Sequence, residues 1–222
     1  MNKGSNFTTP IHDPKIESVL GLLHAVADEQ EASIPDGPRD FHKITWGPDV
    51  FKDMMIPINA EQGAFLYLLA RSISAKTIVE FGTSHGLSTI YCAAAIRDNG
   101  EAGKVVGTEF VPEKVVQAKR HLQEAGLLEF VEIREGDARQ TLKDLPYGID
   151  FCLMDGFPPY SLEVFRLIAP RLRKGAIVIV DGTEMLREPL SNFLAHIGNP
   201  KNGFRYTELS LGDGTGIAVK ES

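Results

Sequence analysis

The fold of this chain is decided by the stretch Ile78-Val79-Glu80-Phe81-Gly82-Thr83-Ser84-His85-Gly86-Leu87-Ser88. A short apolar run ends in an acidic residue, passes through a turn bounded by two glycines and enters an apolar segment typical of a helix. This order of strand, turn and helix start presents backbone N–H groups and the helix dipole to a ligand. Gly82 and Gly86 allow a close approach of the main chain, because they have no Cβ. The stretch therefore predicts a pocket for a nucleotide-type cofactor.

The residues that follow narrow the kind of cofactor. A dinucleotide fingerprint reads G-x-G-x-x-G, and its second glycine lets the backbone approach a pyrophosphate. Ser84 stands at that position here. The next two strand candidates, 104–108 and 130–134, run into Glu109 and into the turn Glu135-Gly136-Asp137-Ala138. A carboxylate at Glu109 is placed to accept hydrogen bonds from both hydroxyls of a ribose. The pattern favours a nucleoside cofactor over a nicotinamide dinucleotide.

Composition limits the class of protein and of partner. With 222 residues, 43% of them hydrophobic and 24% charged, the chain suits one α/β domain with a decorated N-terminus. The net charge of −7 argues against a nucleic acid as partner, since neutralising phosphates needs a basic face. Cys92 and Cys152 lie in apolar segments and are predicted to be small buried hydrophobes. No secretory signal or bilayer-spanning run is visible, so we expect a cytoplasmic protein without a membrane partner.

From residue 76 onward, predicted strands and helices alternate. Such alternation implies a doubly wound, Rossmann-like sheet that is mostly parallel, with helices on both faces. Two last strands flank a Gly-Asp-Gly turn at 212–214 and predict a C-terminal antiparallel hairpin, the sixth and seventh strands. We divide the chain into an N-terminal helix and lid segment, 1–60, and a cofactor-binding domain, 61–222. The predicted strands are 77–81, 104–108, 130–134, 150–154, 176–180, 204–209 and 216–220. The predicted helices are 14–28, 61–72, 88–97, 112–125, 138–144, 161–172 and 187–196.

From Met54 to the C-terminus, the chain resembles class I S-adenosylmethionine-dependent methyltransferases, specifically the small catechol/caffeoyl-CoA-type O-methyltransferases. The motifs that carry the resemblance are Ile56-Pro57-Ile58-Asn59-Ala60-Glu61-Gln62-Gly63, Glu80-Phe81-Gly82-Thr83-Ser84-His85-Gly86-Leu87-Ser88-Thr89, Gly107-Thr108-Glu109, Gly136-Asp137-Ala138, Asp150-Phe151-Cys152-Leu153-Met154-Asp155-Gly156 and Lys174-Gly175-Ala176-Ile177-Val178-Ile179-Val180-Asp181. The resemblance implies a seven-stranded sheet, S-adenosyl-L-methionine as cofactor and a homodimer.

The resemblance also implies roles for single residues. Around the methionine part of the cofactor it places Glu80, Gly82, Thr83, Ser84 and Ser88. Glu109 would hold the ribose, Phe110 would lie beside the adenine, and Asp137 and Ala138 would meet the adenine edge. Met54, Ile56 and Ile58 would form a lid over cofactor and substrate, and Asp155 would reach both.

The chain departs from the family at the site of a divalent metal such as magnesium. Metal-dependent members carry an acidic ligand after the fourth strand, a basic lysine three residues later, and Asp-Asn at the end of the fifth strand. Here Asp155 and Asp181 keep the two acidic positions, but Pro158 replaces the lysine and Gly182 replaces the asparagine. We therefore expect no tightly bound catalytic metal, and Asp155 with Asp181 remain the ligands if an ion is bound.

Methyl transfer needs alignment in a dry pocket, and a base only if the acceptor is protonated. Asp155 and His85 are the candidate catalytic residues, with His42 as a further candidate base. The alternative for His85 is that it packs against the loop and caps a backbone carbonyl. We expect an O-methyltransferase acting on a small molecule. The alternative is a relative that binds S-adenosylmethionine without transferring its methyl group, motivated by the changes at Pro158 and Gly182.

Overall fold

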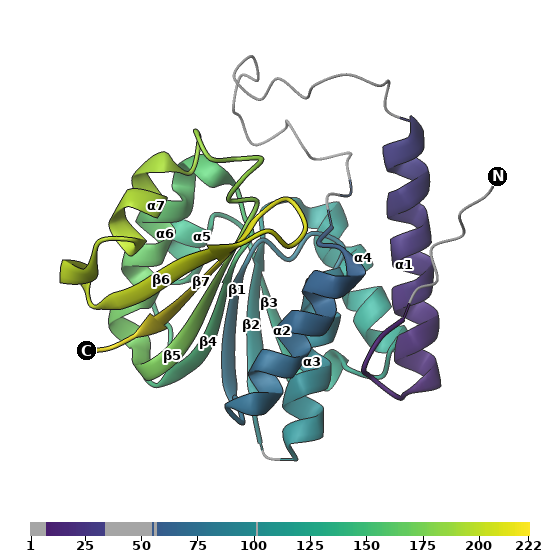
Figure 1. The fold of residues 1–222 in the computed structure, drawn as a ribbon. Helices are drawn as coiled ribbons and strands as arrows, with labels where there is room; N and C mark the ends of the chain where they lie inside the picture. Colours follow the sequence, from purple (N-terminus) through teal and green to yellow (C-terminus); the bar gives the residue numbers. More distant parts are fainter. Residues whose placement is uncertain (1–7, 34–54, 56, 101) are drawn as a thin grey trace.

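The computed structural model describes residues 8–33, 55, 57–100 and 102–222. A seven-stranded sheet in the order β3-β2-β1-β4-β5-β7-β6 forms its centre (Figure 1). The first five strands pair in parallel, whereas β7 pairs antiparallel with both β5 and β6. The predicted fold class is therefore confirmed. The strands are β1 Thr77–Phe81, β2 Lys104–Glu109, β3 Val131–Glu135, β4 Ile149–Met154, β5 Leu172–Asp181, β6 Phe204–Leu209 and β7 Thr215–Lys220.

Seven α-helices of the described residues cover the two faces of this sheet. The buried hydrophobic side chains form two clusters, one on each face of the sheet. Because side chains alternate along a strand, Ile78 of β1 belongs to the first cluster and Val79 to the second. Helices α1 to α4 share the cluster of Ile78, and α5 to α7 share that of Val79, on opposite sides of the sheet in Figure 1. The helices are α1 Pro14–Ser33, α2 Ala60–Ser72, α3 Leu87–Asn99, α4 Pro112–Glu124, α5 Ala138–Thr141, α6 Ser161–Ile168 and α7 Ser191–Ile197.

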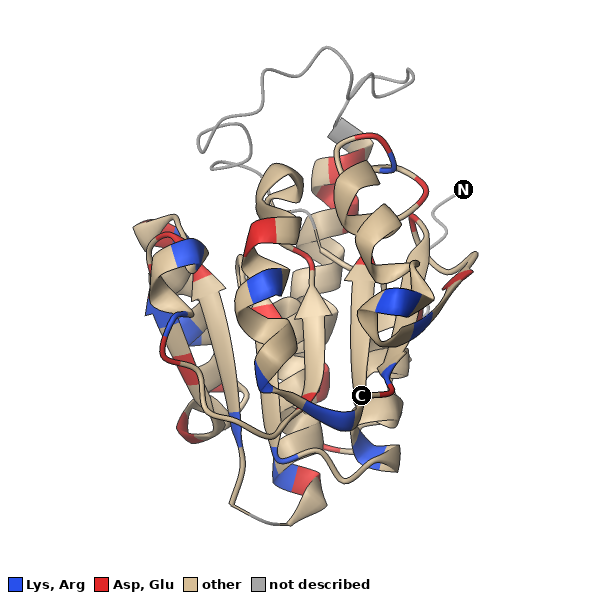
Figure 2. Ribbon diagram, turned by 90° about the vertical axis from the view of Figure 1, so that its left-hand side faces the viewer, with Lys and Arg blue, Asp and Glu red and all other residues tan. Residues whose placement is uncertain are grey.

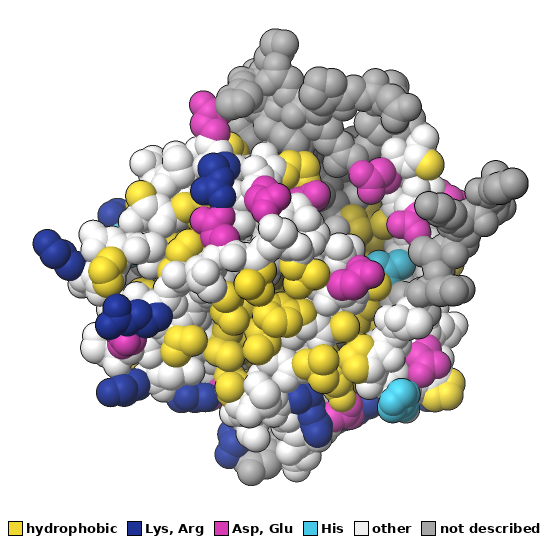
Figure 3. Space-filling model, in the orientation of Figure 1, with side chains coloured by type: hydrophobic (Ala, Val, Ile, Leu, Met, Phe, Trp, Pro, Cys, Tyr) yellow, Lys and Arg dark blue, Asp and Glu magenta, His cyan; other side chains and the backbone are white. Residues whose placement is uncertain are grey.

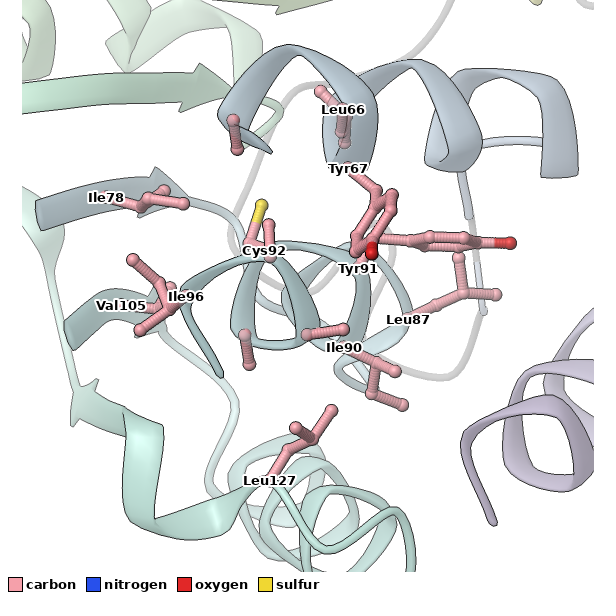
Figure 4. Packing of buried hydrophobic residues seen from close by; sticks show 14 of the residues in the cluster. Leu66, Tyr67, Ile78, Leu87, Ile90, Tyr91, Cys92, Ile96, Val105 and Leu127 are labelled. Atoms are coloured by element: carbon pink, nitrogen blue, oxygen red, sulfur yellow. The ribbon is translucent and has the colours of Figure 1, made fainter. Parts of the chain in front are cut away.

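Helix α3 lies at the centre of the first cluster and follows directly on the glycine turn. Figure 4 shows its side chains between Ile78 and Val105 of the sheet, Leu66 of α2 and Leu127. Every residue from Leu87 to Ile96 is buried, as expected of a helix that is apolar on all sides. The start of α3, which borders the predicted pocket, is therefore held rigidly by packing.

Helix α1 belongs to the same core. Ile16, Leu20 and Leu23 are each at most 3% exposed and pack into the cluster around α3. The helix continues to Ser33, five residues beyond its predicted end. The rest of the predicted connector and the side chains of His42, Met54 and Ile56 lie outside the described residues. The boundary that we placed at residue 60 stays a prediction.

Four further predicted ranges were wrong at one end by three or more residues. Helix α6 stops at Ile168 instead of 172, because Pro170 has no N–H to continue the helix and the chain turns into a 3₁₀ segment. Strand β5 begins at Leu172, four residues before its predicted start, and continues through Gly175, whose φ is +76°. The pairing of β5 with β4 is irregular along this part of the strand, and the hydrophobic periodicity of the sequence does not show such an irregularity. Helix α7 begins at Ser191 instead of 187, and α5 ends at Thr141 instead of 144.

Charges of both signs are mixed on the side of the molecule formed by α5 to α7 (Figure 2). Cys92 and Cys152 are buried and free, as the sequence predicts. Of the helices in the described ranges, none has the length and apolar character needed to cross a bilayer.

Candidate functional site

A pocket lies at the carboxyl edge of β1 and β4. The turn after β1 and Asp155 at the end of β4 both line it. The structure thus brings together most of the predicted cofactor residues with the candidate base His85. Its lining residues are Met55, Pro57, Ile58, Gly82, Thr83, Ser84, His85, Leu87, Ser88 and Asp155. A larger open groove of about 830 Å³ lies between α7 and β6 and contains none of the predicted residues.

Gly82 is required by the close approach of two strand ends. It adopts φ +100°, and a Cβ at this position would lie 2.4 Å from the backbone oxygen of Asp155. The amide of Asp155 in turn donates to the carbonyl of Phe81 at 2.9 Å. The absent side chain therefore lets the ends of β1 and β4 come together at the pocket.

Glu80 lies beneath the turn, fully buried, and does not line the pocket. Its carboxylate accepts hydrogen bonds from three hydroxyl groups: Thr83 Oγ1 at 2.8 Å, Ser88 Oγ at 2.7 Å and Thr89 Oγ1 at 2.5 Å. Burial raises the pKa of Glu80, and the three donors oppose that shift. Glu80 thus ties the turn to the first turn of α3, and a direct contact with the cofactor stays a prediction.

Glu109 bridges the glycine turn and the loop after β2. Its Oε2 accepts the backbone N–H of Ser84 at 2.7 Å, and its Oε1 accepts that of Val111 at 2.8 Å. Each carboxylate oxygen can accept a second hydrogen bond, so capacity remains for a ribose. Phe110 beside it is 54% exposed and available to a flat ligand.

The predicted adenine edge lies at the start of α5. Asp137 caps this helix, and both of its oxygens also bind the guanidinium of Arg139 at 2.8–3.1 Å. Arg139 lies 3.7 Å above the ring of Tyr160, which meets Phe157 edge to face. These contacts connect the adenine edge with the aromatic loop after β4. Ala138 is buried at the same helix start.

Asp155 and Asp181 end the neighbouring strands β4 and β5 and face each other. Their carboxyl groups share a hydrogen bond, and Gln62 Nε2 donates to Asp181 Oδ1 at 2.5 Å. Burial and the neighbouring negative charge raise the pKa of Asp155 well above its usual range. Burial also raises the pKa of Asp181, to about 6. Such a pair holds a proton more readily than a single exposed carboxylate does.

His85 borders the pocket from the glycine turn. Its Nδ1 lies 3.3 Å from Ser84 Oγ, and its carbonyl oxygen lies 2.8 Å from His121 Nδ1. Burial, helped by the charge of Lys114, lowers the pKa of His85 to about 4. The ring is therefore neutral at neutral pH, which a proton acceptor requires.

The pocket wall opposite the turn contains residues that sequence reasoning missed. Met55 lines it in addition to the predicted Ile58, and the amide of Gln30 holds the backbone of Met55. Gln62 also donates to Thr215 Oγ1 at 3.0 Å and accepts the N–H of Asn59 at 3.0 Å. The predicted helix 61–72 gave no signal for these contacts with β5 and β7.

The residues at the family's metal position do not fit a divalent cation. The Gln62 amide directs an N–H at Asp181 and cannot turn round, because its oxygen already accepts the N–H of Asn59. Gly182 offers no side-chain oxygen, and a Cβ there would lie 2.9 Å from Leu186 Cδ1, which would have to shift. Pro158 is buried, and its side chain has no ligand atom. The described residues also hold no group of three His, Cys, Asp or Glu side chains arranged for a metal.

Comparison with known proteins adds the following similarities. Residues 79–183 match a family model described as a methyltransferase domain. Catechol O-methyltransferase of Mycobacterium tuberculosis is 36% identical over 127 residues, 57% of this chain and 56% of that protein. Caffeoyl-CoA O-methyltransferase 1 of Eucalyptus globulus is 27% identical over 130 residues, 56% of this chain and 52% of that protein. The chain thus aligns with little more than half the length of these relatives.

The fold extends the similarity over nearly the whole chain. The crystal structure of cofactor-bound Rv0187 from MTB superposes with a TM-score of 0.70 at 27% sequence identity. The match covers 95% of this chain and 91% of that one.

Proposed function

Because this chain belongs to the S-adenosylmethionine-dependent methyltransferases of the catechol and caffeoyl-CoA type, we propose that it methylates a hydroxyl group of a small molecule. The observation that carries the proposal is the pocket at the turn after β1, which Asp155 lines, together with the Glu109 carboxylate that accepts the N–H of Ser84 in that turn. Acidic groups suit a cationic sulfonium and the hydroxyls of a ribose.

The residues present fit this cofactor. The turn at 82–84 with Ser88 would hold the methionine part, and Ile58 would close the opposite wall. Glu109 would hold the ribose, while Phe110, Asp137 and Ala138 would border the adenine. The cofactor itself supplies a methyl group that is already reactive, and the protein supplies orientation and exclusion of water.

On the acceptor side we assign His85 to accept the proton of the attacking hydroxyl and Asp155 to hold that hydroxyl by a hydrogen bond. Both border the pocket, and His85 is neutral at neutral pH. The aromatic pair Phe157 and Tyr160 next to Asp155 supports a flat, aromatic acceptor. Replacing Asp155 with Asn or His85 with Gln should lower kcat more than the affinity for the cofactor.

We further propose that the reaction needs no divalent metal. The Gln62 contact and the packing of Leu186 at Gly182 support this. Activity measured after EDTA treatment and dialysis should match that measured with added MgCl₂. A loss of activity with EDTA that MgCl₂ restores would contradict the proposal.

The direct test is product analysis with S-adenosylmethionine and catechol as the first acceptor, followed by other phenols. S-adenosylhomocysteine formed in proportion to a methylated product supports the proposal. Intact cofactor recovered beside a rearranged acceptor would support the alternative, a cofactor-binding relative that does not transfer the methyl group. Pro158 and Gly182, which stand in place of the family's lysine and asparagine, motivate that alternative.

A homodimer is also proposed. Hydrophobic side chains gather on the face between β7 and α2 (Figure 3). Of the two elements that border this face, α2 carries Leu68, which is 54% exposed, and β7 carries Val219, which is 39% exposed. An apolar patch of this kind commonly marks a protein interface. Two free buried thiols support a reducing, cytoplasmic setting.

A further inference from the structure

The side chain of Gln30, near the end of α1, binds both backbone polar groups of Met55. Gln30 Nε2 donates to the Met55 carbonyl at 2.8 Å, and Gln30 Oε1 accepts the Met55 N–H at 2.9 Å. The amide thereby acts as a neighbouring strand would, fixing the main chain at one residue. Met55 is 7% exposed and lines the pocket at the glycine turn.

The helix that carries Gln30 is anchored in the core by other residues. The buried residues Ile16, Leu20 and Leu23 anchor α1 in the core, and His24 Nε2 lies 3.2 Å from the hydroxyl of Tyr91 on α3. None of these contacts involves Gln30. These contacts anchor α1 at other residues, so the helix can stay in place when the Gln30 amide is replaced.

The other end of the same pocket wall is fixed by a capping box. Asn59 Oδ1 accepts the N–H of Gln62 at 2.8 Å, and Gln62 Oε1 accepts the N–H of Asn59 at 3.0 Å. Ile58, next to Asn59, is 3% exposed and lines the pocket. Met55 and Ile58 are thus held at the two ends of one short wall, by Gln30 at one end and by the start of α2 at the other.

We propose that Gln30 is a positioning residue for the cofactor pocket, through which helix α1 holds the wall at Met55 in its binding position. The inference rests on the proposed function and adds a residue from outside the segment that matches the methyltransferase domain. A wall ordered before binding lowers the entropic cost of closing around the ligand. Without the two hydrogen bonds between Gln30 and Met55, the entropic cost of ordering this wall would reduce the free energy of cofactor binding.

The test is calorimetric titration of the full chain with S-adenosylhomocysteine and S-adenosylmethionine. Gln30→Met keeps the length of the side chain and removes both hydrogen bonds, and we expect it to weaken binding about tenfold. Gln30→Glu keeps an acceptor for the Met55 N–H but sets a carboxylate against the carbonyl, so a similar loss is expected. Glu29→Gln, at the exposed neighbouring position, is the control and should bind like the unaltered chain.

Kinetics separate a positioning role from general damage. The KM for S-adenosylmethionine should rise in Gln30→Met while the KM for the acceptor and the melting temperature stay unchanged. Binding within about twofold of the unaltered chain in both Gln30 variants would overturn the inference and leave the proposed function intact. If Gln30→Met unfolds, Gln30→Glu decides by the same criterion. An unaltered chain that binds neither compound would overturn the proposed function itself.

Discussion

Substitution of Glu109 tests the ribose site that we propose. Glu109→Ala removes the acceptor for the N–H groups of Ser84 and Val111, and the acceptor that we propose for the two ribose hydroxyls. Affinity for S-adenosylmethionine should fall by roughly 1.5–3 kcal/mol, the usual worth of charge-assisted hydrogen bonds. Calorimetry measures this, with Glu113→Ala, an exposed carboxylate four residues away, as the matched control. Unchanged affinity in Glu109→Ala would remove this residue from the site.

His85 gives stability a pH dependence of predictable sign. Its pKa is about 4 in the folded chain and 6.5 in the unfolded one. The unfolded state therefore binds the proton first, and stability falls as the pH drops from 6.5 toward 4. At about pH 5 the loss should be about 1 kcal/mol, allowing for the solvent-exposed part of the ring.

Urea unfolding of the unaltered chain and of His85→Gln at neutral and acid pH checks this. The substitution should remove that part of the pH dependence and leave the contribution of His24, whose pKa burial also lowers. Identical pH profiles for the two chains would show that the folded chain does not exclude a proton from His85.

For single residues, the sequence predicts which ones lie at the pocket when they belong to one continuous motif or end a strand. The glycine turn, Ser88 and Asp155 lie together at the pocket as expected. It does not predict side chains that act across the fold. Gln62 meets Asp181 at a separation of 119 residues, and Gln30 meets Met55 at 25. A single glutamine in an amphipathic helix has no local pattern that reveals its partner.

The junction of β1 and β4 should be sensitive to a single methyl group. Gly82→Ala places a Cβ 2.4 Å from a backbone oxygen and keeps φ at +100°, where alanine is strained. Strain of this kind costs about 1–3 kcal/mol, and the clash adds to it. Thermal unfolding measures the loss.

Gly100→Ala is the matched control for this variant. Its φ is +75°, and nothing lies within 4 Å of the new Cβ, so it reports the backbone strain alone. Gly82→Ala should be clearly the less stable of the two. Equal stability would mean that the strand ends separate without cost.

The predicted elements agree best where strands are buried. The range 77–81 coincides with β1, because an apolar run bounded by charge and glycine allows few alternatives. The errors fall where a helix passes into a strand. The range 161–172 contains a helix, a 3₁₀ turn and the first residue of β5, and each of the three includes apolar side chains. Periodicity over so few residues does not separate these states.

The apolar face between β7 and α2 predicts the behaviour of the whole molecule. Sedimentation velocity at micromolar concentration should show a homodimer. Replacing Leu68 and Val219 together with Lys should shift the chain toward monomer, because charges cannot be buried in such an interface without partners. Leu22→Lys, at an equally exposed leucine on α1, should leave the assembly unchanged. A monomer before any substitution would contradict the expectation.

Strand β7 is an interior strand although it lies last among the seven. It separates β5 from β6, so β6 forms the outer edge of the sheet. While the chain is made from its amino end, the outer side of β5 has no neighbour until residues 204–220 have emerged. During that interval, unpaired N–H and C=O groups of β5 offer a template to any other extended chain. Substitutions that delay or weaken pairing of the β6–β7 hairpin should therefore increase aggregation during synthesis, even though the hairpin is a small part of the chain.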